Sequence, residues 1–268
     1  MTRPSLCGNQ CAQPAALIVL SVLGRWQTPK PADVVVQGPP GDGSLTWRSN
    51  LADEVSFLGM DSWVAYDAMG QDFADHAAGG AANAHYDRPA MLAALGNVVD
   101  QDVLDAACGP GFYLQALIEG GARVRGFDGS EEMIRLARQR VGEGVEIRQA
   151  SLDQPLPYGD GSFDSVLCAL AIHYAADRRA TFREFFRVLR PGGRCVISTQ
   201  HATTDWLRKG GSYFDVVLET DTWRLDGGEQ EVQFWREPLS EMCAAATDAG
   251  FVIRKVIEPR PAESMREA

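Results

Sequence analysis

Short apolar runs alternate with helix-like segments from residue 102 onward, and this alternation constrains the fold more than any other feature of the chain. The expected strands are Val103–Ala107, Arg123–Asp128, Val145–Gln149, Ser165–Leu170, Arg194–Thr199 and Phe251–Ile257. The helices expected between them are Leu114–Glu119, Glu131–Arg140 and Ala180–Leu189, with the last stopped by Pro191-Gly192-Gly193. The pattern predicts an α/β fold, a Rossmann-like, doubly wound and mainly parallel sheet with flanking helices.

The segment VLDAACGPGF, Val103–Phe112, joins the first strand to the first helix through two glycines. Asp105 lies near the end of that strand, and Gly109 and Gly111 let the backbone pass close to a ligand because they carry no Cβ. The next strand ends at Asp128, whose carboxylate can accept both hydroxyl groups of a ribose. A glycine turn followed by an acidic strand end predicts a cofactor of the adenosine type.

The spacing of the glycines distinguishes between cofactors. A dinucleotide site has the pattern G-x-G-x-x-G, in which the third glycine allows close helix packing below a pyrophosphate. Here the third position is Leu114, which weakens the case for an NAD(P)-dependent oxidoreductase.

Four ordered segments resemble the class I S-adenosylmethionine-dependent methyltransferases, in particular their small-molecule, ubiquinone-biosynthesis-like branch. They are the glycine turn at 103–111, FDGSEEM at 127–133, GSFDSVLCALAIHY at 161–174 and FREFFRVLRPGGR at 182–194. The resemblance covers roughly residues 62–260. It implies S-adenosyl-L-methionine as the cofactor and methyl transfer to a small organic acceptor.

The resemblance also implies positions for the cofactor. The methionine half is expected along Asp105, Ala107, Cys108 and Gly109, with Gly111 in the same turn. The ribose is expected at Asp128, the adenine at Gly129, Met133 and Ser151, the methyl group near Ala169, and a covering N-terminal helix at Tyr86.

The sequence departs from the family pattern at three places. Ala107 replaces a glycine, which is acceptable only if this residue keeps a negative φ. Ser151 stands where an aspartate is common, so either adenine recognition is weaker or Asp153 substitutes. The family sheet ends in a two-stranded hairpin, but only eleven residues follow Phe251–Ile257. One hypothesis is that Ala15–Leu20 supplies the missing strand from the other end of the chain.

Methyl transfer from a sulfonium mainly requires in-line alignment, and a base only where the acceptor loses a proton. His201 follows the fifth strand, at a position that often carries a histidine in related enzymes, and His173 follows the fourth. Both are candidate acid–base residues, because histidine titrates nearest neutral pH. The alternative for each is a packing or structural hydrogen-bonding role.

Residues 201–237 interrupt the strand–helix alternation and are rich in aromatic side chains, as expected of a cap over the acceptor. Tyr213 and Trp235 are the residues expected to approach the pocket. An aromatic or apolar acceptor is expected from this composition, with ordinary packing inside the cap as the alternative.

The charge balance of 36 acidic and 25 basic residues, a net charge of −11, argues against nucleic acid or an anionic membrane as partner. The six cysteines show no disulfide or metal-site spacing, and Cys7 and Cys11 alone would not make a closed metal site. A cytoplasmic protein without a metal is expected. The apolar run Ala15–Leu23 is too short to span a membrane. The oligomeric state is left open, a homo-oligomer included.

The expected organisation has four parts. Residues 1–59 are an N-terminal extension, weakly ordered or appended; 60–101 are a helical lid; 102–260 are the cofactor-binding domain with the cap at 201–237; and 261–268 are a tail. Two alternatives to a methyltransferase are an NAD(P)-dependent oxidoreductase and a non-catalytic nucleoside-binding scaffold of the same fold.

Overall fold

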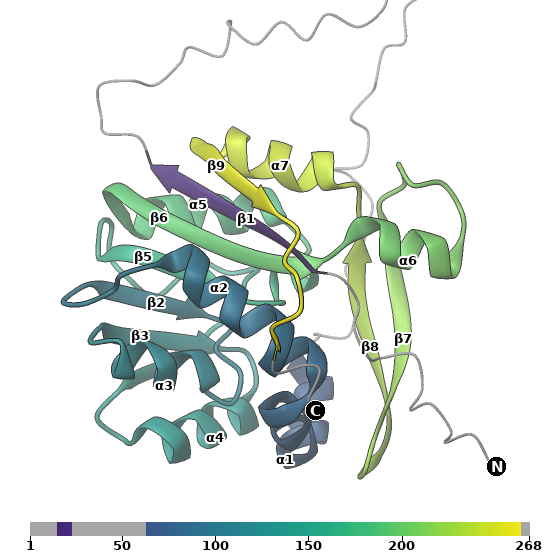
Figure 1. The fold of residues 1–268 in the computed structure, drawn as a ribbon, viewed down its shortest axis with the longest axis horizontal. Helices are drawn as coiled ribbons and strands as arrows, with labels where there is room; N and C mark the ends of the chain where they lie inside the picture. The colour runs from purple at the N-terminus through teal and green to yellow at the C-terminus, as the bar shows by residue number, and fades with distance from the viewer. Residues whose placement is uncertain (1–14, 23–62, 264–268) are drawn as a thin grey trace, which may run out of the picture.

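A seven-stranded sheet forms the centre of the computed structural model, which describes residues 15–22 and 63–263 (Figure 1). The strand order is β4-β3-β2-β5-β6-β1-β9. Its members are β1 (Ala15–Val22), β2 (Asp102–Ala106), β3 (Arg123–Asp128), β4 (Glu146–Gln149), β5 (Phe163–Cys168), β6 (Leu189–Gln200) and β9 (Phe251–Ile257). Neighbouring strands from β4 to β6 pair in parallel, whereas β1 pairs antiparallel with both β6 and β9. The expected doubly wound α/β sheet is confirmed.

Helices cover both faces of this sheet. The helices α2 (Arg88–Leu95), α3 (Phe112–Glu119) and α4 (Glu131–Val141) pack on one face, and α5 (Arg178–Val188) and α7 (Leu239–Asp248) on the other. The prediction that Pro191-Gly192-Gly193 stops the preceding helix was only approximate. The helix ends at Val188, and β6 already includes these three residues, with an irregular register opposite β5 where Phe163 pairs with Leu189 and Ser165 with Arg194.

Strand β1 completes the sheet from the N-terminal end of the chain. It lies between β6 and β9 (purple in Figure 1), with Ile18 opposite both Ile197 and Val256. Leu17, Ile18 and Leu20 are fully buried, because the pleat directs them alternately into the cores on the two faces of the sheet. The hypothesis that Ala15–Leu20 replaces the missing C-terminal strand is confirmed.

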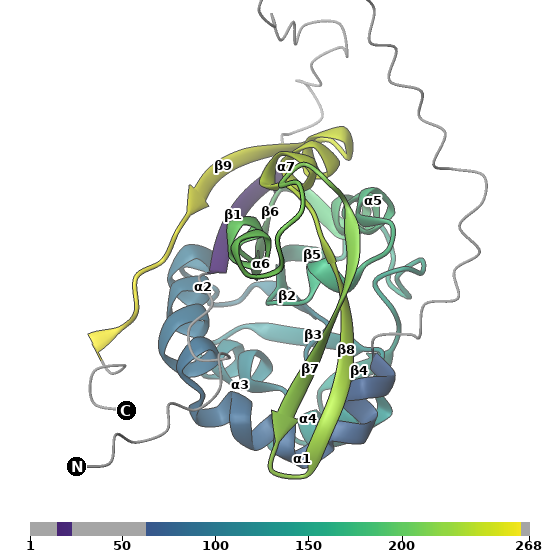
Figure 2. The same ribbon diagram turned by 90° about the vertical axis from the view of Figure 1, so that its right-hand side faces the viewer.

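The elements outside the main sheet gather at the carboxyl ends of its parallel strands. They are α1 (Trp63–Gly79), the π-helical turn η1 (Asn83–Asp87), the 3-10 turn η2 (Ile172–Tyr174), α6 (Ala202–Lys209) and the hairpin of β7 (Val217–Leu225) and β8 (Gly228–Arg236). Figure 2 shows the hairpin running across this end of the sheet toward α1. Helix α1 is broken at Gly70, where φ is 44° and ψ is −120°.

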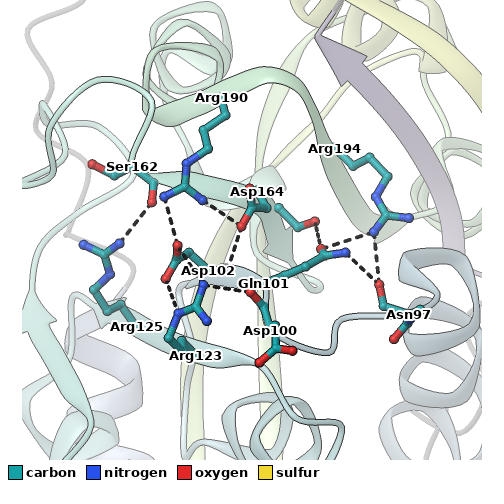
Figure 3. Close-up of polar contacts among 11 residues, drawn as sticks. Asn97, Asp100, Gln101, Asp102, Arg123, Arg125, Ser162, Asp164, Arg190 and Arg194 are labelled. Carbon is teal, nitrogen blue, oxygen red and sulfur yellow. Dashed lines mark hydrogen bonds and ion pairs between the residues drawn. The ribbon is translucent and has the colours of Figure 1, made fainter.

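An ion-pair network joins the amino ends of the parallel strands, at the opposite edge of the sheet (Figure 3). Arg190 reaches Asp102 at 2.9 Å and Asp164 at 2.7 Å, and Arg123 bonds Asp102 at 3.0 Å. The backbone N–H of Asp102 also donates to Asp164 at 2.8 Å. The network connects the starts of β2, β3, β5 and β6 and is far from the cavity described below.

None of the helices in residues 63–263 has the length and hydropathy needed to cross a membrane. Most of the expected N-terminal extension, including Cys7 and Cys11, lies outside the described residues.

Candidate active site

A cavity of about 510 Å³ opens at the carboxyl ends of β2, β3, β5 and β6. This volume lies within the range of about 300–1,000 Å³ that is typical of small-molecule sites. Its walls come from the loops after these four strands, from α1, η1 and η2 and from the hairpin. Several residues that the sequence placed at the cofactor line this cavity. Besides those discussed below, they are Tyr86, Cys108, Gly129, Met133, Ser151 and Ala169.

Asp128 lies at the end of β3 with its carboxylate held by backbone donors. Gly109 N–H donates to Oδ2 at 2.8 Å and Ser130 N–H to Oδ1 at 3.0 Å. Burial raises the pKa of Asp128 to about 6, and the N–H groups of Ser130 and Gly109 oppose that shift. Asp128 is therefore ionised above pH 6 and can accept hydrogen bonds from a ligand in the cavity.

The turn after β2 brings its backbone to the cavity in a left-handed conformation. Gly109 has φ +53°, and a Cβ built on it would meet no atom within 4 Å. Ala107 also lines the cavity, with φ 55°. The expected negative φ at Ala107 was therefore wrong, because the turn requires the left-handed conformation at this residue as well. Leu170, after β5, is a third cavity residue with positive φ, 48°. Such strain concentrates at functional sites.

Two residues expected at the cofactor, Asp105 and Gly111, lie outside the cavity lining. A Cβ on Gly111 would come within 3.0 Å of the Ala137 Cα, so this glycine allows α3 and α4 to pack closely. Asp105 is 1% exposed within the sheet, and its Oδ2 has no hydrogen-bond partner among the described residues. Burial, and then the charge of Asp128, raise the pKa of Asp105 to about 8.

The sequence interpretation missed Asp87 and Arg88, which enter the cavity from η1 and α2. Tyr113 donates to Asp87 Oδ2 at 2.6 Å, while Asp87 Oδ1 and Arg88 Nε are buried and have no partner among the described residues. Burial raises the pKa of Asp87 to about 6. The sequence interpretation used this segment only for Tyr86, since nothing in the pattern YDRPA indicates where the two charged side chains point.

Aromatic side chains form the opposite wall. The Tyr66 and Tyr174 hydroxyls lie 2.7 Å apart, and the Tyr66 ring packs edge-on against Phe73, Tyr174 and Trp223. Trp63 also lines the cavity and packs against the backbone of Gly129, where a Cβ would come within 2.9 Å of its ring. This wall could not be predicted from the sequence, because nothing in the sequence indicates that α1 and β7 pack against each other.

Tyr213 and Trp235, the cap residues expected at the pocket, lie elsewhere. The Tyr213 hydroxyl accepts a hydrogen bond from Leu239 N–H at 3.2 Å, and its ring packs on Trp206. Trp235 lines a small separate cavity behind the main one. The hairpin places Trp223 at the cavity instead. Side chains alternate between the two faces of β7, and the packing of the hairpin turns the face that carries Trp223 toward the cavity.

The two candidate histidines have different surroundings. His201 does not belong to the described lining of the cavity. Its Nδ1 caps the start of α6, 2.7 Å from Thr203 Oγ1, and its Nε2 lies 3.0 Å from Glu258 Oε1. His173 does line the cavity, with Nδ1 3.2 Å from Thr199 Oγ1. Burial, with the nearby charge of Arg178, lowers the pKa of His173 to about 3, so its ring is neutral near pH 7.

The comparisons with known proteins agree with this geometry. A family model described as a methyltransferase domain matches residues 104–197, from β2 to β6. A solved S-adenosylmethionine-dependent methyltransferase from Mesorhizobium loti is 27% identical, with a TM-score of 0.54, and the match covers 71% of this chain and 90% of that one. Residues 104–197 thus form a methyltransferase domain, and the fold around them matches that of an S-adenosylmethionine-dependent methyltransferase.

Two curated proteins that are similar to this chain are named as methyltransferases. The demethylmenaquinone methyltransferase of Lactococcus lactis subsp. lactis is 33% identical over 43% of this chain and 49% of its own length. The ubiquinone biosynthesis O-methyltransferase of Pseudomonas paraeruginosa is 29% identical over 58% of this chain and 66% of its own. The chain thus spans about half to two thirds of these relatives.

The described residues of the methyltransferase domain fit S-adenosylmethionine as its cosubstrate. Asp128 places at the cavity a carboxylate, the group that accepts ribose hydroxyls in sites of this kind, and the space at Gly109 leaves room for a ligand against the backbone. Asp87 and Arg88 line the same cavity and carry the negative and positive charges that complement the ammonium and carboxylate of a methionine group.

Proposed function

We propose that this chain transfers the methyl group of S-adenosylmethionine to a small aromatic acceptor bound in the same cavity. The observation that carries the proposal is the meeting of Asp128, the open Gly109 turn and the aromatic wall around Tyr66 in one cavity. The acidic net charge further supports a small molecule over nucleic acid as acceptor. The names of the curated relatives favour a quinone- or phenol-type ring.

In this proposal the protein acts mainly by aligning the acceptor with the methyl group. S-adenosylmethionine supplies a methyl group already activated by its sulfonium, and the acceptor displaces S-adenosylhomocysteine in line. In this proposal Asp128 and the Gly109 turn fix the nucleoside, while Arg88 and Asp87 hold the methionine end. Ala169 and Leu170, at the end of β5, border the space between cofactor and acceptor.

His173 is our candidate for the residue that contacts the acceptor hydroxyl, whose proton is lost when the oxygen is methylated. With a pKa of about 3, its neutral ring accepts a hydrogen bond but takes up a full proton poorly near pH 7. The role we propose is therefore polarisation of the acceptor hydroxyl, with the proton passing on to solvent. We propose no such role for His201, because its ring is engaged by Thr203 and Glu258.

Calorimetric titration with S-adenosylhomocysteine at pH 8, where Asp128 is ionised, tests the proposal. We expect a dissociation constant in the micromolar range, about −8 kcal/mol, and loss of binding in Asp128→Ala. The control Asp160→Ala removes an exposed carboxyl, 82% accessible, and should bind as the wild type does. Absence of binding to the wild-type protein would leave only a scaffold of the methyltransferase fold.

A further inference from the structure

We propose that the Gln200 carboxamide oxygen accepts a hydrogen bond from a hydroxyl group of an uncharged acceptor. Gln200 is then a positioning residue that selects neutral phenol-type rings over carboxylated ones. The inference rests on the proposed methyl transfer and adds to it the recognition element and the charge of the acceptor.

Gln200 is the last residue of β6, at the carboxyl edge of the sheet. Its backbone lies opposite Ala15 of β1, which fixes the strand end in place. The side chain lines both the main cavity and the small cavity behind it. Its Oε1 is buried and has no hydrogen-bond partner among the described residues, so accepting a bond from a ligand requires the Gln200 amide to turn its oxygen toward the cavity. A buried acceptor left unpaired is costly, so a ligand that supplies a donor gains affinity there.

The neighbouring polar groups on this wall are satisfied within the protein. His173 Nδ1 pairs with Thr199 Oγ1 at 3.2 Å, and the Tyr66 and Tyr174 hydroxyls pair with each other at 2.7 Å. The Gln200 oxygen therefore differs from its neighbours in lacking a donor. His173 and Gln200 line the same two cavities, so we expect a hydroxyl bound at Gln200 to lie near the His173 ring.

The basic side chains that α6 and the hairpin bring to the cavity and its border are paired with opposite charges. Arg208 lies 2.6 Å from Asp221 and 2.8 Å from Asp205, and Lys209 lies 2.7 Å from Asp221. Arg224, which also lines the cavity, pairs with Glu229 at 2.6 Å. A carboxylate that binds beside these residues would lose its hydration without finding an unpaired cation among them, whereas a neutral hydroxyl needs only the Gln200 oxygen.

The test measures binding of three probes to the protein saturated with S-adenosylhomocysteine, by ligand-observed NMR. Methyl 4-hydroxybenzoate carries a neutral hydroxyl, methyl 4-methoxybenzoate lacks the donor, and 4-hydroxybenzoate carries a carboxylate. We expect the first probe to bind about fivefold more tightly than the second, as for one added hydrogen bond. It should also bind at least about fivefold more tightly than the third. In Gln200→Leu the preference over the methoxy probe should disappear.

Two further variants make the result specific to Gln200. Gln200→Asn withdraws the oxygen by one methylene and should also lose the preference, while Gln115→Leu, exposed on α3, should keep it. The proposal is overturned if Gln200→Leu and Gln200→Asn keep the preference, if the carboxylate binds as well as its ester, or if no probe binds. The affinity for S-adenosylhomocysteine, measured in the same samples, separates this failure from failure of the proposed function.

Discussion

Asp105 and Asp128 arise from the same sequence pattern, an aspartate near the carboxyl end of a buried parallel strand, yet their carboxyl groups have different surroundings. Asp128 accepts two backbone N–H groups at the cavity, whereas Asp105 Oδ2 is buried without a partner among the described residues. Burial raises both pKa values, to about 6 for Asp128 and about 8 for Asp105. The sequence predicted the position of both residues at strand ends but not which of them lines the cavity.

The pKa of Asp105 leads to a prediction about stability and pH. A carboxyl whose pKa is raised on folding contributes its full stabilisation below the unfolded pKa, and this contribution is lost progressively as pH rises to the folded value. For Asp105 the window runs from the ordinary aspartate pKa of 3.8 to about 8. We expect the free energy of unfolding of Asp105→Asn to rise relative to wild type by on the order of 1 kcal/mol per pH unit in this window.

Urea unfolding at pH 5, 6.5 and 8 measures this difference. The control Asp160→Asn changes an exposed carboxyl and should show no such trend. Equal pH dependence in wild type and Asp105→Asn would show that the Asp105 carboxyl is not buried in the way the structure describes.

At the scale of elements, the two glycines of the turn after β2 separate into a binding role and a packing role. Both have positive φ, 53° at Gly109 and 84° at Gly111. The space beside Gly109 is open to the cavity, whereas the space beside Gly111 is filled by the backbone of α4 at Ala137. The motif in the sequence does not distinguish them, because the difference depends on where α4 returns.

Alanine substitutions should therefore have different main effects at the two positions, on ligand binding at Gly109 and on stability at Gly111. Gly109→Ala should reduce the free energy of unfolding by only about 1–2 kcal/mol, the cost of a left-handed alanine, but should abolish binding of S-adenosylhomocysteine. Gly111→Ala adds a contact with the α4 backbone and should reduce stability by roughly 3 kcal/mol. Urea unfolding and calorimetric titration measure the two effects.

Gly142→Ala is the matched control for Gly109. Gly142 has φ +87° and, like Gly109, no atom within 4 Å of its missing Cβ, but it does not line the cavity. It should lose about the same stability as Gly109→Ala and retain binding. If Gly109→Ala also retained binding, the backbone at Gly109 would not approach the ligand.

At the scale of the whole molecule, segments near opposite ends of the chain meet in one sheet. Strand β1 from residues 15–22 lies between β6 and the last strand, β9, and its side chains enter the cores on both faces. Leu17 and Val19 belong to the cluster that includes Tyr86, Met91 and Leu95, so β1 also packs with η1 and α2. The strand is an integral part of the domain.

This placement predicts a large effect of a charge in β1. Ile18 is fully buried, whereas Val256, opposite it in β9, is 47% exposed. Ile18→Asp should destabilise the protein by about 3–5 kcal/mol, a large part of the total of about 5–15 kcal/mol for a typical domain. Val256→Asp should change stability far less. Thermal and urea unfolding of both variants measure this, and equal stability of the two would mean that β1 is peripheral.

The sequence by itself determined the strand–helix order, the glycine turn, the acidic strand end at Asp128 and the methyltransferase family, because these depend on local periodicity and short-range motifs. The tertiary structure decided which side chains reach the cavity. It brought in Asp87, Arg88, Tyr66, Trp223 and Gln200, and it left Asp105, His201, Tyr213 and Trp235 outside the main cavity. The physical reason is that side-chain direction depends on how helices, hairpin and strands pack across long sequence separations. The position of β1 was visible in the sequence only as a short apolar run, and its pairing with β6 and β9 required both ends of the chain.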